Sequence, residues 1–533
     1  MRPAAQTLER LGTRGVTHRA IRPDNVFQSA PGQPVTLGQG WAAPPASLQP
    51  ALFEPPYSAM CLPCGRGEGS VADDVYALGA LMVALALGLT PLAALDSNAV
   101  TRRKLEVGSF AALVGEARLA SAIADLARGM LAEDPEHRPT PSHLLNPDAA
   151  RARWPAARPR KRAQFPVRIG GWTAWDTRAL AHVIAANPEP GAAALRGGAI
   201  DMWLRRDLGE TALAAEVEDA VHAGPTGELE HRADALLVLR AVAVLDPLAP
   251  LCWRGLALWP DGFGPALATE RPESEASEAL SEIAAASLSP QWIKVRRRGD
   301  TTRAIAEARR SQALLRDGGT RRLAYALNPL LACDSKLLGG LVVVEVADLV
   351  PALEIQAGRL APGTRLVDAD IAALVAARSE QPAHATLAAL ALGDGGPMSA
   401  RAALAQLELL AALQRGATVP ALARCLVATP DLLLAGWQGA AKRRELAAHL
   451  TGLAQVGELA PILEAVADPA GRVADQRAAR AAAGALARLD AELASIEAGG
   501  SVRATAARSL GQEAAAGLAL AALALSITVT PFG

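Results

Sequence analysis

Two short segments near the N-terminus carry residue types that could bind a metal ion or a phosphate group. Cys61 and Cys64 have the C-x-x-C spacing found in zinc sites and in redox-active pairs. A zinc site needs two further Cys or His ligands, and no second close pair of these residues follows in the sequence. The glycine-rich stretch 65–70 lacks the lysine of a phosphate-binding P-loop. The sequence therefore predicts no metal centre and no nucleotide site at these residues.

A longer segment, residues 15–26, reads Gly-Val-Thr-His-Arg-Ala-Ile-Arg-Pro-Asp-Asn-Val and follows an expected helix over 4–14. It resembles the H-R-D-L-x-x-x-N catalytic loop of the protein kinase family, with His18, Arg19 and Asn25 in the family's order. Residues 72–79, Ala-Asp-Asp-Val-Tyr-Ala-Leu-Gly, resemble the start of the central helix of the family's large lobe. Residues 134–140, Asp-Pro-Glu-His-Arg-Pro-Thr, resemble a loop late in the same lobe. Together the three motifs predict a bacterial Ser/Thr kinase-like large lobe over residues 1–150.

The departures from the family pattern concern catalysis. In the family, an Asp of the catalytic loop accepts the proton of the substrate hydroxyl, and here Ala20 stands at that position. An Asp-Phe-Gly motif supplies a further Asp for Mg²⁺, which needs oxygen ligands, and here Gly38 replaces that Asp while Gly40 matches the glycine. Asn25 matches a metal-binding Asn, and Arg22 replaces a Lys that neutralises phosphate charge. The resemblance therefore implies a degenerate, pseudokinase-like loop without a catalytic residue and without an ATP or Mg²⁺ cofactor.

Other matching residues have structural roles in the family. Asp74 aligns with an Asp that braces the backbone of the catalytic loop, and Arg138 aligns with an Arg that pairs with the Glu of an Ala-Pro-Glu motif. That motif reads Ala59-Met60-Cys61 here, so we expect Arg138 to pair with another acceptor. Only 17 residues precede His18, so we expect the family's small ATP-covering lobe to be missing, or Met1 to be a misassigned start.

Composition narrows the remaining classes of protein. The 533 residues include 53 Lys and Arg against 54 Asp and Glu, which argues against nucleic-acid binding through net positive charge. Hydrophobic residues are 51% of the chain and aromatic residues 3%, so the cores must be rich in Ala and Leu, which favour helix. The preference for Arg over Lys is typical of a GC-rich bacterial genome. The N-terminus has no apolar run, so we expect a cytoplasmic protein.

Beyond residue 150 the sequence shows no motif that specifies a family. Residues 151–170 are basic and interrupted by Pro, and we interpret them as a linker. Residues 171–360 predict a mainly helical domain, with one short strand or buried run at 341–344. Residues 361–512 predict a helical bundle or an irregular helical repeat.

Two uncharged stretches raise the question of a membrane. Residues 75–95 are long enough to span a bilayer, but Gly88 and Pro91 interrupt them, and we predict a buried helix ending near Gly88. Residues 514–533 carry no charge and follow a helix with charged residues. They predict a C-terminal membrane anchor over 514–530, and the alternative is a final helix packed on the bundle.

The retained structural motifs beside lost catalytic ones predict a regulatory or scaffolding protein that contacts protein partners and does not bind nucleic acid. One alternative is a Ser/Thr kinase whose start was misassigned. The other is a helical-repeat binding module in which the kinase-like region is only a folding unit. Neither the partners nor the oligomeric state follow from the sequence.

Overall fold

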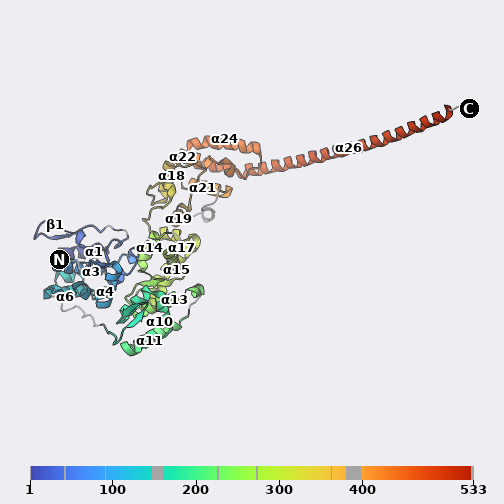
Figure 1. Cartoon of the computed structure of the whole chain (residues 1–533). Helices are drawn as coiled ribbons and strands as arrows, with labels where there is room; N and C mark the ends of the chain where they lie inside the picture. The colour runs from blue at the N-terminus through green and yellow to red at the C-terminus, as the bar shows by residue number, and fades with distance from the viewer. Residues whose placement is uncertain are drawn as a thin grey trace. The chain divides into compact units, whose positions relative to one another are not determined.

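The computed structural model describes residues 2–40, 42, 44–89, 92–146, 160–224, 227–271, 274–361, 363–379 and 398–529. These residues are mostly helical, as the composition predicts (Figure 1). The chain divides into two compact units. The first unit comprises Met1–Asp334 with Asp370–Pro382, and the second comprises Ser335–Ala369 with Ala383–Gly533.

The N-terminal part of the first unit, up to residue 146, places short helices around one long buried helix. Strands β1 (Val26–Gln28) and β2 (Val35–Leu37) form an antiparallel hairpin in which Val26 pairs with Leu37. The α-helices are α1 (Arg2–Gly12), α2 (Pro56–Ala59), α3 (Val71–Leu87), α4 (Ser97–Val107), α5 (Ser109–Val114), α6 (Ser121–Met130) and α7 (Pro141–Leu145). Short 3₁₀ helices connect them at η1 (Pro23–Asn25), η2 (Ala51–Phe53), η3 (Pro63–Arg66) and η4 (Pro135–His137).

Helix α3 is the centre of this part. Ser70 and Asp73 form a capping box at its start, which satisfies amide groups that the first turn leaves free. Residues 74–84 are all buried, and the helix ends at Gly88, whose φ of 65° is the left-handed conformation that glycine adopts at low cost. The buried helix predicted from the uncharged run is therefore confirmed. Its apolar surface packs in the protein core.

The rest of the first unit, from residue 160, contains two antiparallel hairpins and a layer of helices. The hairpins are β3 (Val167–Ile169) with β4 (Trp172–Ala174), and β5 (Leu251–Trp253) with β6 (Leu256–Leu258). The helices are α9 (Thr177–Ala186), α10 (Pro188–Arg196), α11 (Ala199–Trp203), α12 (Thr211–His222), α13 (Ala233–Leu245), α14 (Phe263–Thr269), α15 (Glu275–Ala285), α16 (Leu288–Arg296), α17 (Thr301–Leu327) and α19 (Ala369–Arg378). Further short turns are a π-helix, η5 (Leu204–Leu208), and the 3₁₀ helices η6 (Gly227–Arg232) and η7 (Pro260–Gly262). Helix α13 contributes residues to two hydrophobic cores.

The two parts of the first unit are joined by backbone and side-chain contacts. The amide of Leu62 donates to the carbonyl of Ala257 at 2.9 Å, and the amide of Trp259 donates to the carbonyl of Gly65 at 2.9 Å. Cys61 is buried in a core otherwise made by residues beyond 160. These contacts tie η3 to strand β6, so the two parts share one packed interior.

The predicted basic linker is described only in part, because residues 147–159 lie outside the described residues. Arg160 donates to the carbonyl of Leu105 at 2.7 Å and to Asp176 at 2.9 Å. The last residues of the predicted linker, Val167–Ile169, form strand β3. From Arg160 onward this basic stretch is therefore part of the packed unit.

The second unit is helical within the described residues. Its helices are α18 (Leu349–Ala357), α21 (Ala400–Leu413), α22 (Pro420–Val427), α23 (Pro430–Leu433), α24 (Ala440–Val456), α25 (Leu459–Ala467) and α26 (Pro469–Val529), with 3₁₀ turns η8 (Lys336–Leu338) and η9 (Val346–Asp348). Residues 341–344 form no strand. Val343 is buried and Val342 is 78% exposed, so this run is an extended loop that buries alternate side chains.

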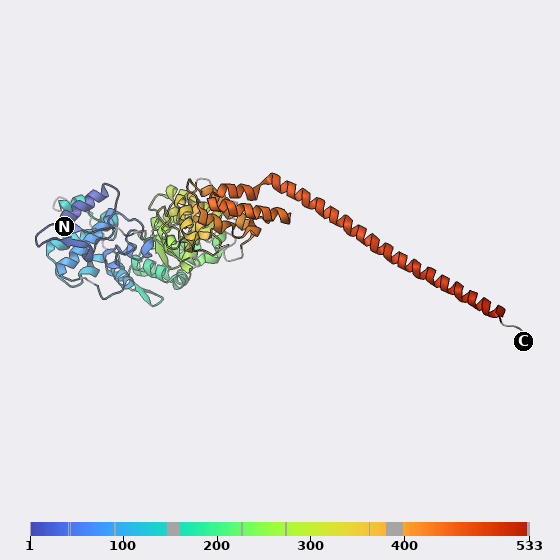
Figure 2. The ribbon, with the colours of Figure 1, turned by 90° about the horizontal axis from the view of Figure 1, so that it is seen from above.

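Helix α26 is one continuous helix of 61 residues (Figures 1 and 2). At 1.5 Å per residue it is about 90 Å long. It passes without interruption through Gly499 and Gly500. Its large apolar side chains are exposed, from Val473 to Ile527. Among the described residues, one helical stretch, Leu459–Ile527, is long and apolar enough to cross a membrane, and most of it is α26.

Candidate functional site

The loop between α1 and β1, residues 18–25, is held by the first turn of α3. Asp74 accepts the amide of His18 with Oδ2 and the amide of Arg19 with Oδ1, both at 2.7 Å. Arg19 has a φ of 53°, a left-handed conformation that costs an ordinary residue about 1–2 kcal/mol. Burial raises the pKa of Asp74 to about 6, and the two amide donors oppose that shift. The carboxylate thus makes the contacts that a bracing role requires.

The same loop is tied to residues 38–40 by the side chains of His18 and Asn25. The Nε2 atom of His18 lies 2.8 Å from the carbonyl oxygen of Gly38. The Nδ2 atom of Asn25 donates to the carbonyls of Ala20, at 2.8 Å, and Gln39, at 2.9 Å. Both side chains are therefore used to fix the backbone of the loop.

The two glycines of this segment leave no space for side chains. A Cβ atom at Gly38 would lie 2.1 Å from Oδ1 of Asn25, and one at Gly40 would lie 2.3 Å from the carbonyl oxygen of His18. Contacts this short require the backbone or the neighbouring side chain to move. The position that the kinase resemblance assigns to a metal-binding Asp is therefore closed to a carboxylate in this conformation.

The remaining loop positions offer little to a phosphate or a metal. Ala20 is buried and its side chain offers no acceptor. Arg22 forms an ion pair with Asp24 at 2.8 Å, and the Asp24 side chain is 72% exposed. Within the described residues, no three His, Cys, Asp or Glu side chains are grouped to hold a metal ion. The structure brings His18, Arg19, Asn25 and Asp74 together, and it leaves Arg22 half-buried and paired with Asp24.

A buried network of charges lies beside the loop, and sequence reasoning missed most of it. Arg19 pairs with Glu54 at 3.0 Å, and both side chains are 2% exposed. Asp73 joins Arg19, at 3.5 Å, and Arg138, at 2.9 Å. Burial alone would raise the pKa of Asp73, but Arg19 and Arg138 together lower it. Asp73 is thus the carboxylate that pairs with Arg138. The sequence signal that could have identified it is its position next to Asp74.

Arg138 also closes the end of helix α6. Its side chain donates to the carbonyls of Ala132, at 2.7 Å, Glu133, at 3.0 Å, and Ala72, at 3.0 Å. Because these carbonyls come from two distant segments, one guanidinium group joins the late loop to the start of α3. No spacing rule in the sequence identifies such backbone acceptors.

A second buried cation, Lys104, was also missed. Its Nζ atom donates to the carbonyls of Ala51, Leu52 and Glu54 at 2.7–2.9 Å, and it lies 5.1 Å from the centre of the Tyr76 ring. Burial lowers the pKa of Lys104 to about 7. Lys104 therefore satisfies carbonyl groups of η2 and fixes the backbone of Glu54.

The C-x-x-C pair does not form a reactive dithiol in this structure. Cys61 is buried, and its Sγ atom lies 3.2 Å from the carbonyl oxygen of Tyr57. Burial raises the pKa of Cys61 well above its ordinary value, which disfavours the nucleophilic thiolate. Cys61 is thus a packing residue, and Cys64 is half-buried with a free thiol.

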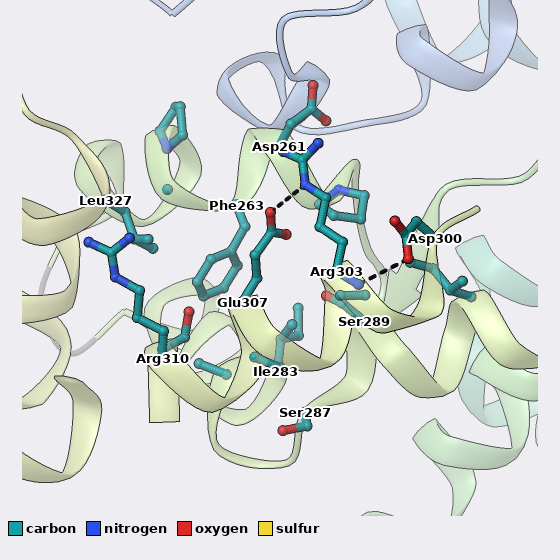
Figure 3. A pocket seen from close by; sticks show the side chains of 18 of the residues that line it. Asp261, Phe263, Ile283, Ser287, Ser289, Asp300, Arg303, Glu307, Arg310 and Leu327 are labelled. Carbon is teal, nitrogen blue, oxygen red and sulfur yellow. Dashed lines mark hydrogen bonds and ion pairs between the residues drawn. The ribbon is translucent and has the colours of Figure 1, made fainter. Parts of the chain in front are cut away.

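A cavity of about 660 Å³ lies among helices α14, α15, α16 and α17 (Figure 3). Phe263, Ile283 and Leu327 contribute its apolar surface. At its rim Arg303 pairs with Glu307 at 2.8 Å, as Figure 3 shows. The volume is in the range of small-molecule sites, but the rim charges of this pair neutralise each other.

No family model matches the chain, and no curated protein or solved structure matches it either.

Proposed function

We propose that this protein is a kinase-like protein without phosphoryl-transfer activity, which acts as a regulatory or scaffolding protein through contacts with protein partners. The observation that carries the proposal is the use of the loop's polar groups. His18 and Asn25 hold backbone carbonyls, and Asp74 holds backbone amides. These side chains are thus used to hold the backbone of the loop and its neighbours.

Phosphoryl transfer needs parts that this loop does not supply. The attacking hydroxyl must be oriented by an acceptor, and metal ions must neutralise the developing charge. Ala20 has no acceptor, and a carboxylate at position 38 would overlap Asn25. The charge network around Arg19 and Asp73 stabilises the fold and needs no substrate to balance it.

The experiment measures transfer of the γ-phosphate of ATP–Mg²⁺ by the full chain, to itself and to general protein substrates. Wild type and Ala20→Asp are compared, because the variant restores the missing acceptor alone. We expect no transfer by either protein, since position 38 still lacks a metal ligand. Transfer by the wild type that depends on ATP–Mg²⁺ would contradict the proposal. Transfer by Ala20→Asp alone would agree with an inactive wild type, and it would show that Ala20 and not position 38 limits the reaction.

We propose in addition that the end of α26 attaches the protein to a membrane. Residues 514–529 are uncharged and helical, and as a helix they are about 24 Å long, somewhat less than the roughly 30 Å hydrocarbon core. Arg503 and Arg508 precede them and favour a cytoplasmic position for the rest of the chain.

Removal of residues 514–533 tests this attachment. We expect the full chain in the membrane fraction after a high-salt wash and the shortened chain in the soluble fraction. A second variant keeps the full length and replaces Leu518, Leu520 and Leu523 by Ser, so it separates loss of apolar side chains from loss of chain length. Soluble full-length protein, or a shortened chain that stays with the membrane, would reject the attachment.

A further inference from the structure

A second cavity of the first unit, of about 370 Å³, is lined by five arginines that come from both of its parts. They are Arg19, Arg66, Arg138, Arg296 and Arg298, and we refer to the space as the arginine cavity. Clustering of this kind is costly, because like charges repel and burial removes their hydration. The distribution of partners among the five shows which charges are balanced.

Three of the five arginines are paired with carboxylates. Arg19 and Arg138 share Asp73, and Arg19 also holds Glu54. Arg298 pairs with Asp134, at 3.0 Å, and with Glu136, at 2.6 Å.

Glu133, which also lines the cavity, pairs with Arg178 at 3.3 Å. Asp261 is a further lining carboxylate, but it is exposed and its Oδ2 atom accepts the amide of Glu68 at 2.9 Å. The buried carboxylates at the cavity are thus matched by arginines, which leaves Arg66 and Arg296 to be explained.

Arg66 is held by backbone carbonyls and not by an ion pair. Its Nη1 atom donates to Ala46 at 2.8 Å and to Gln49 at 2.6 Å, and the residue is 5% exposed. Its Nε atom is buried without a hydrogen-bond partner. Burial lowers the pKa of Arg66. The positive charge is therefore fixed in place, with no carboxylate in contact among the described residues.

Arg296 is held by aromatic rings. Its guanidinium carbon lies 4.2 Å from the centre of the Trp292 ring and 5.7 Å from that of Trp259. Within the described part of the chain, this guanidinium has neither a hydrogen-bond acceptor nor an ion-pair partner. Burial and the neighbouring Arg298 lower its pKa to about 10. Cation–π contacts orient a guanidinium group but do not use its N–H donors.

We propose that the arginine cavity binds a small molecule that carries a phosphoryl group, with Arg296 and Arg66 facing the phosphoryl oxygens. Two fixed guanidinium charges without carboxylates are matched by a dianion, and the planar donor fork of arginine fits phosphoryl oxygens. The cavity is larger than a single phosphate ion needs, so it has room for the organic part of a small phosphate ester. This site is separate from the His18–Asn25 loop and does not depend on the function proposed above.

Calorimetric titration of the full chain with inorganic phosphate and with a sugar phosphate, at constant ionic strength, tests the site. The variant is Arg296→Gln, chosen because Arg296 makes no hydrogen bond whose loss would disturb the fold. The control is Arg297→Gln, which removes the same charge from the next residue, whose side chain is 76% exposed and pairs with Glu216. Thermal unfolding of each variant without ligand verifies that it is folded.

We expect saturable binding by the wild type and by Arg297→Gln, and at least a tenfold loss of affinity in Arg296→Gln. Tighter binding of the sugar phosphate identifies a phosphate ester as the ligand, and equal binding identifies phosphate itself. The proposal is overturned if neither compound binds saturably to the wild type. It is equally overturned if the two variants lose the same affinity, because binding would then reflect surface charge alone.

Discussion

At the scale of single residues, the loop at 18–25 depends on one carboxylate. Asp74 accepts two backbone amides at 2.7 Å, so each of its oxygens has a separate structural task. Charged acceptors make stronger hydrogen bonds than neutral ones, and a buried amide left without an acceptor costs about 1–3 kcal/mol. Asp74 therefore holds the start of the loop, beside the contacts that His18 and Asn25 make to backbone carbonyls.

Asp74→Asn tests this dependence. The amide nitrogen of Asn would face a backbone N–H, so one of the two hydrogen bonds must be lost, and we expect the free energy of unfolding to fall by about 1–3 kcal/mol. Urea denaturation of the full chain measures the change. Asp24→Asn is the matched control, because the Asp24 side chain is 72% exposed, and we expect it to change stability by less than about 0.5 kcal/mol. Equal effects of the two substitutions would contradict the bracing role.

A second residue-scale prediction concerns pH and His182. Burial, and then the nearby Arg102, lower the pKa of His182 to about 4 from an ordinary value of 6.5. The unfolded chain therefore binds a proton between these values that the folded chain does not, so acidification from pH 6.5 to pH 4 reduces stability. We expect this one group to contribute a loss of about 2 kcal/mol.

The comparison with His182→Phe isolates that contribution. Asp74 titrates in the same pH range in both proteins, with the opposite sign, because its folded pKa is raised, and its effect cancels in the difference. Chemical denaturation between pH 4 and pH 7 should give a stability difference between the two proteins that changes with pH. A difference that stays constant over this range would show that His182 is not the group responsible.

At the scale of elements, α3 illustrates what the sequence could predict. Its apolar run, its Asp residues at the start and Gly88 at the end are all local signals, and the helix has those limits. The three hairpins were not predicted, because strands of three residues are too short to show an alternating pattern. Helix α26 continues through Gly499 and Gly500, which lower helix propensity, because the Ala-rich sequence around them favours helix.

Some residues of the candidate site could likewise be identified from the sequence, and others could not. His18 and Asn25 stand in one short segment, so motif comparison could single them out, and Asp74 was singled out by a second segment that begins at residue 72. Glu54 and Lys104 were not, because their partners are distant in the sequence and are in part backbone atoms. Arg296 was also missed: Trp292 precedes it by one helical turn in α16, but Trp259 comes from a separate segment.

The packing of α3 against α6 gives an element-scale prediction. A Cβ atom at Gly79 would lie 2.8 Å from Cβ of Met130, so Gly79→Ala must push the two helices apart. We expect a loss of about 1–3 kcal/mol in the free energy of unfolding although Ala favours helix. In contrast, Gly484→Ala in α26 meets no atom within 4 Å and should increase helix stability. Thermal unfolding followed by circular dichroism compares the two, and a stabilising Gly79→Ala would show that the contact is not tight.

At the scale of the whole molecule, the first unit joins two parts that the predicted linker separates in the sequence. Besides the backbone contacts of η3, the hydroxyl of Tyr57 donates to the buried Asp246 at 2.6 Å. Arg178 adds an ion pair to Glu133 at 3.3 Å. Because residues from before and after the linker share one core, we expect them to unfold in a single cooperative transition.

Tyr57→Phe tests this cooperativity. The substitution keeps the ring in the core but leaves the buried carboxylate of Asp246 without its hydroxyl donor, so we expect a loss of about 1–3 kcal/mol. If the two parts unfold together, the variant lowers the unfolding temperature of the entire first unit. Hydrogen exchange followed by peptide mass analysis would then show the same change of protection in α3 and in α13. A change confined to the residues before 146 would show instead that the two parts unfold independently, and the contacts between them would then contribute little to the stability of either.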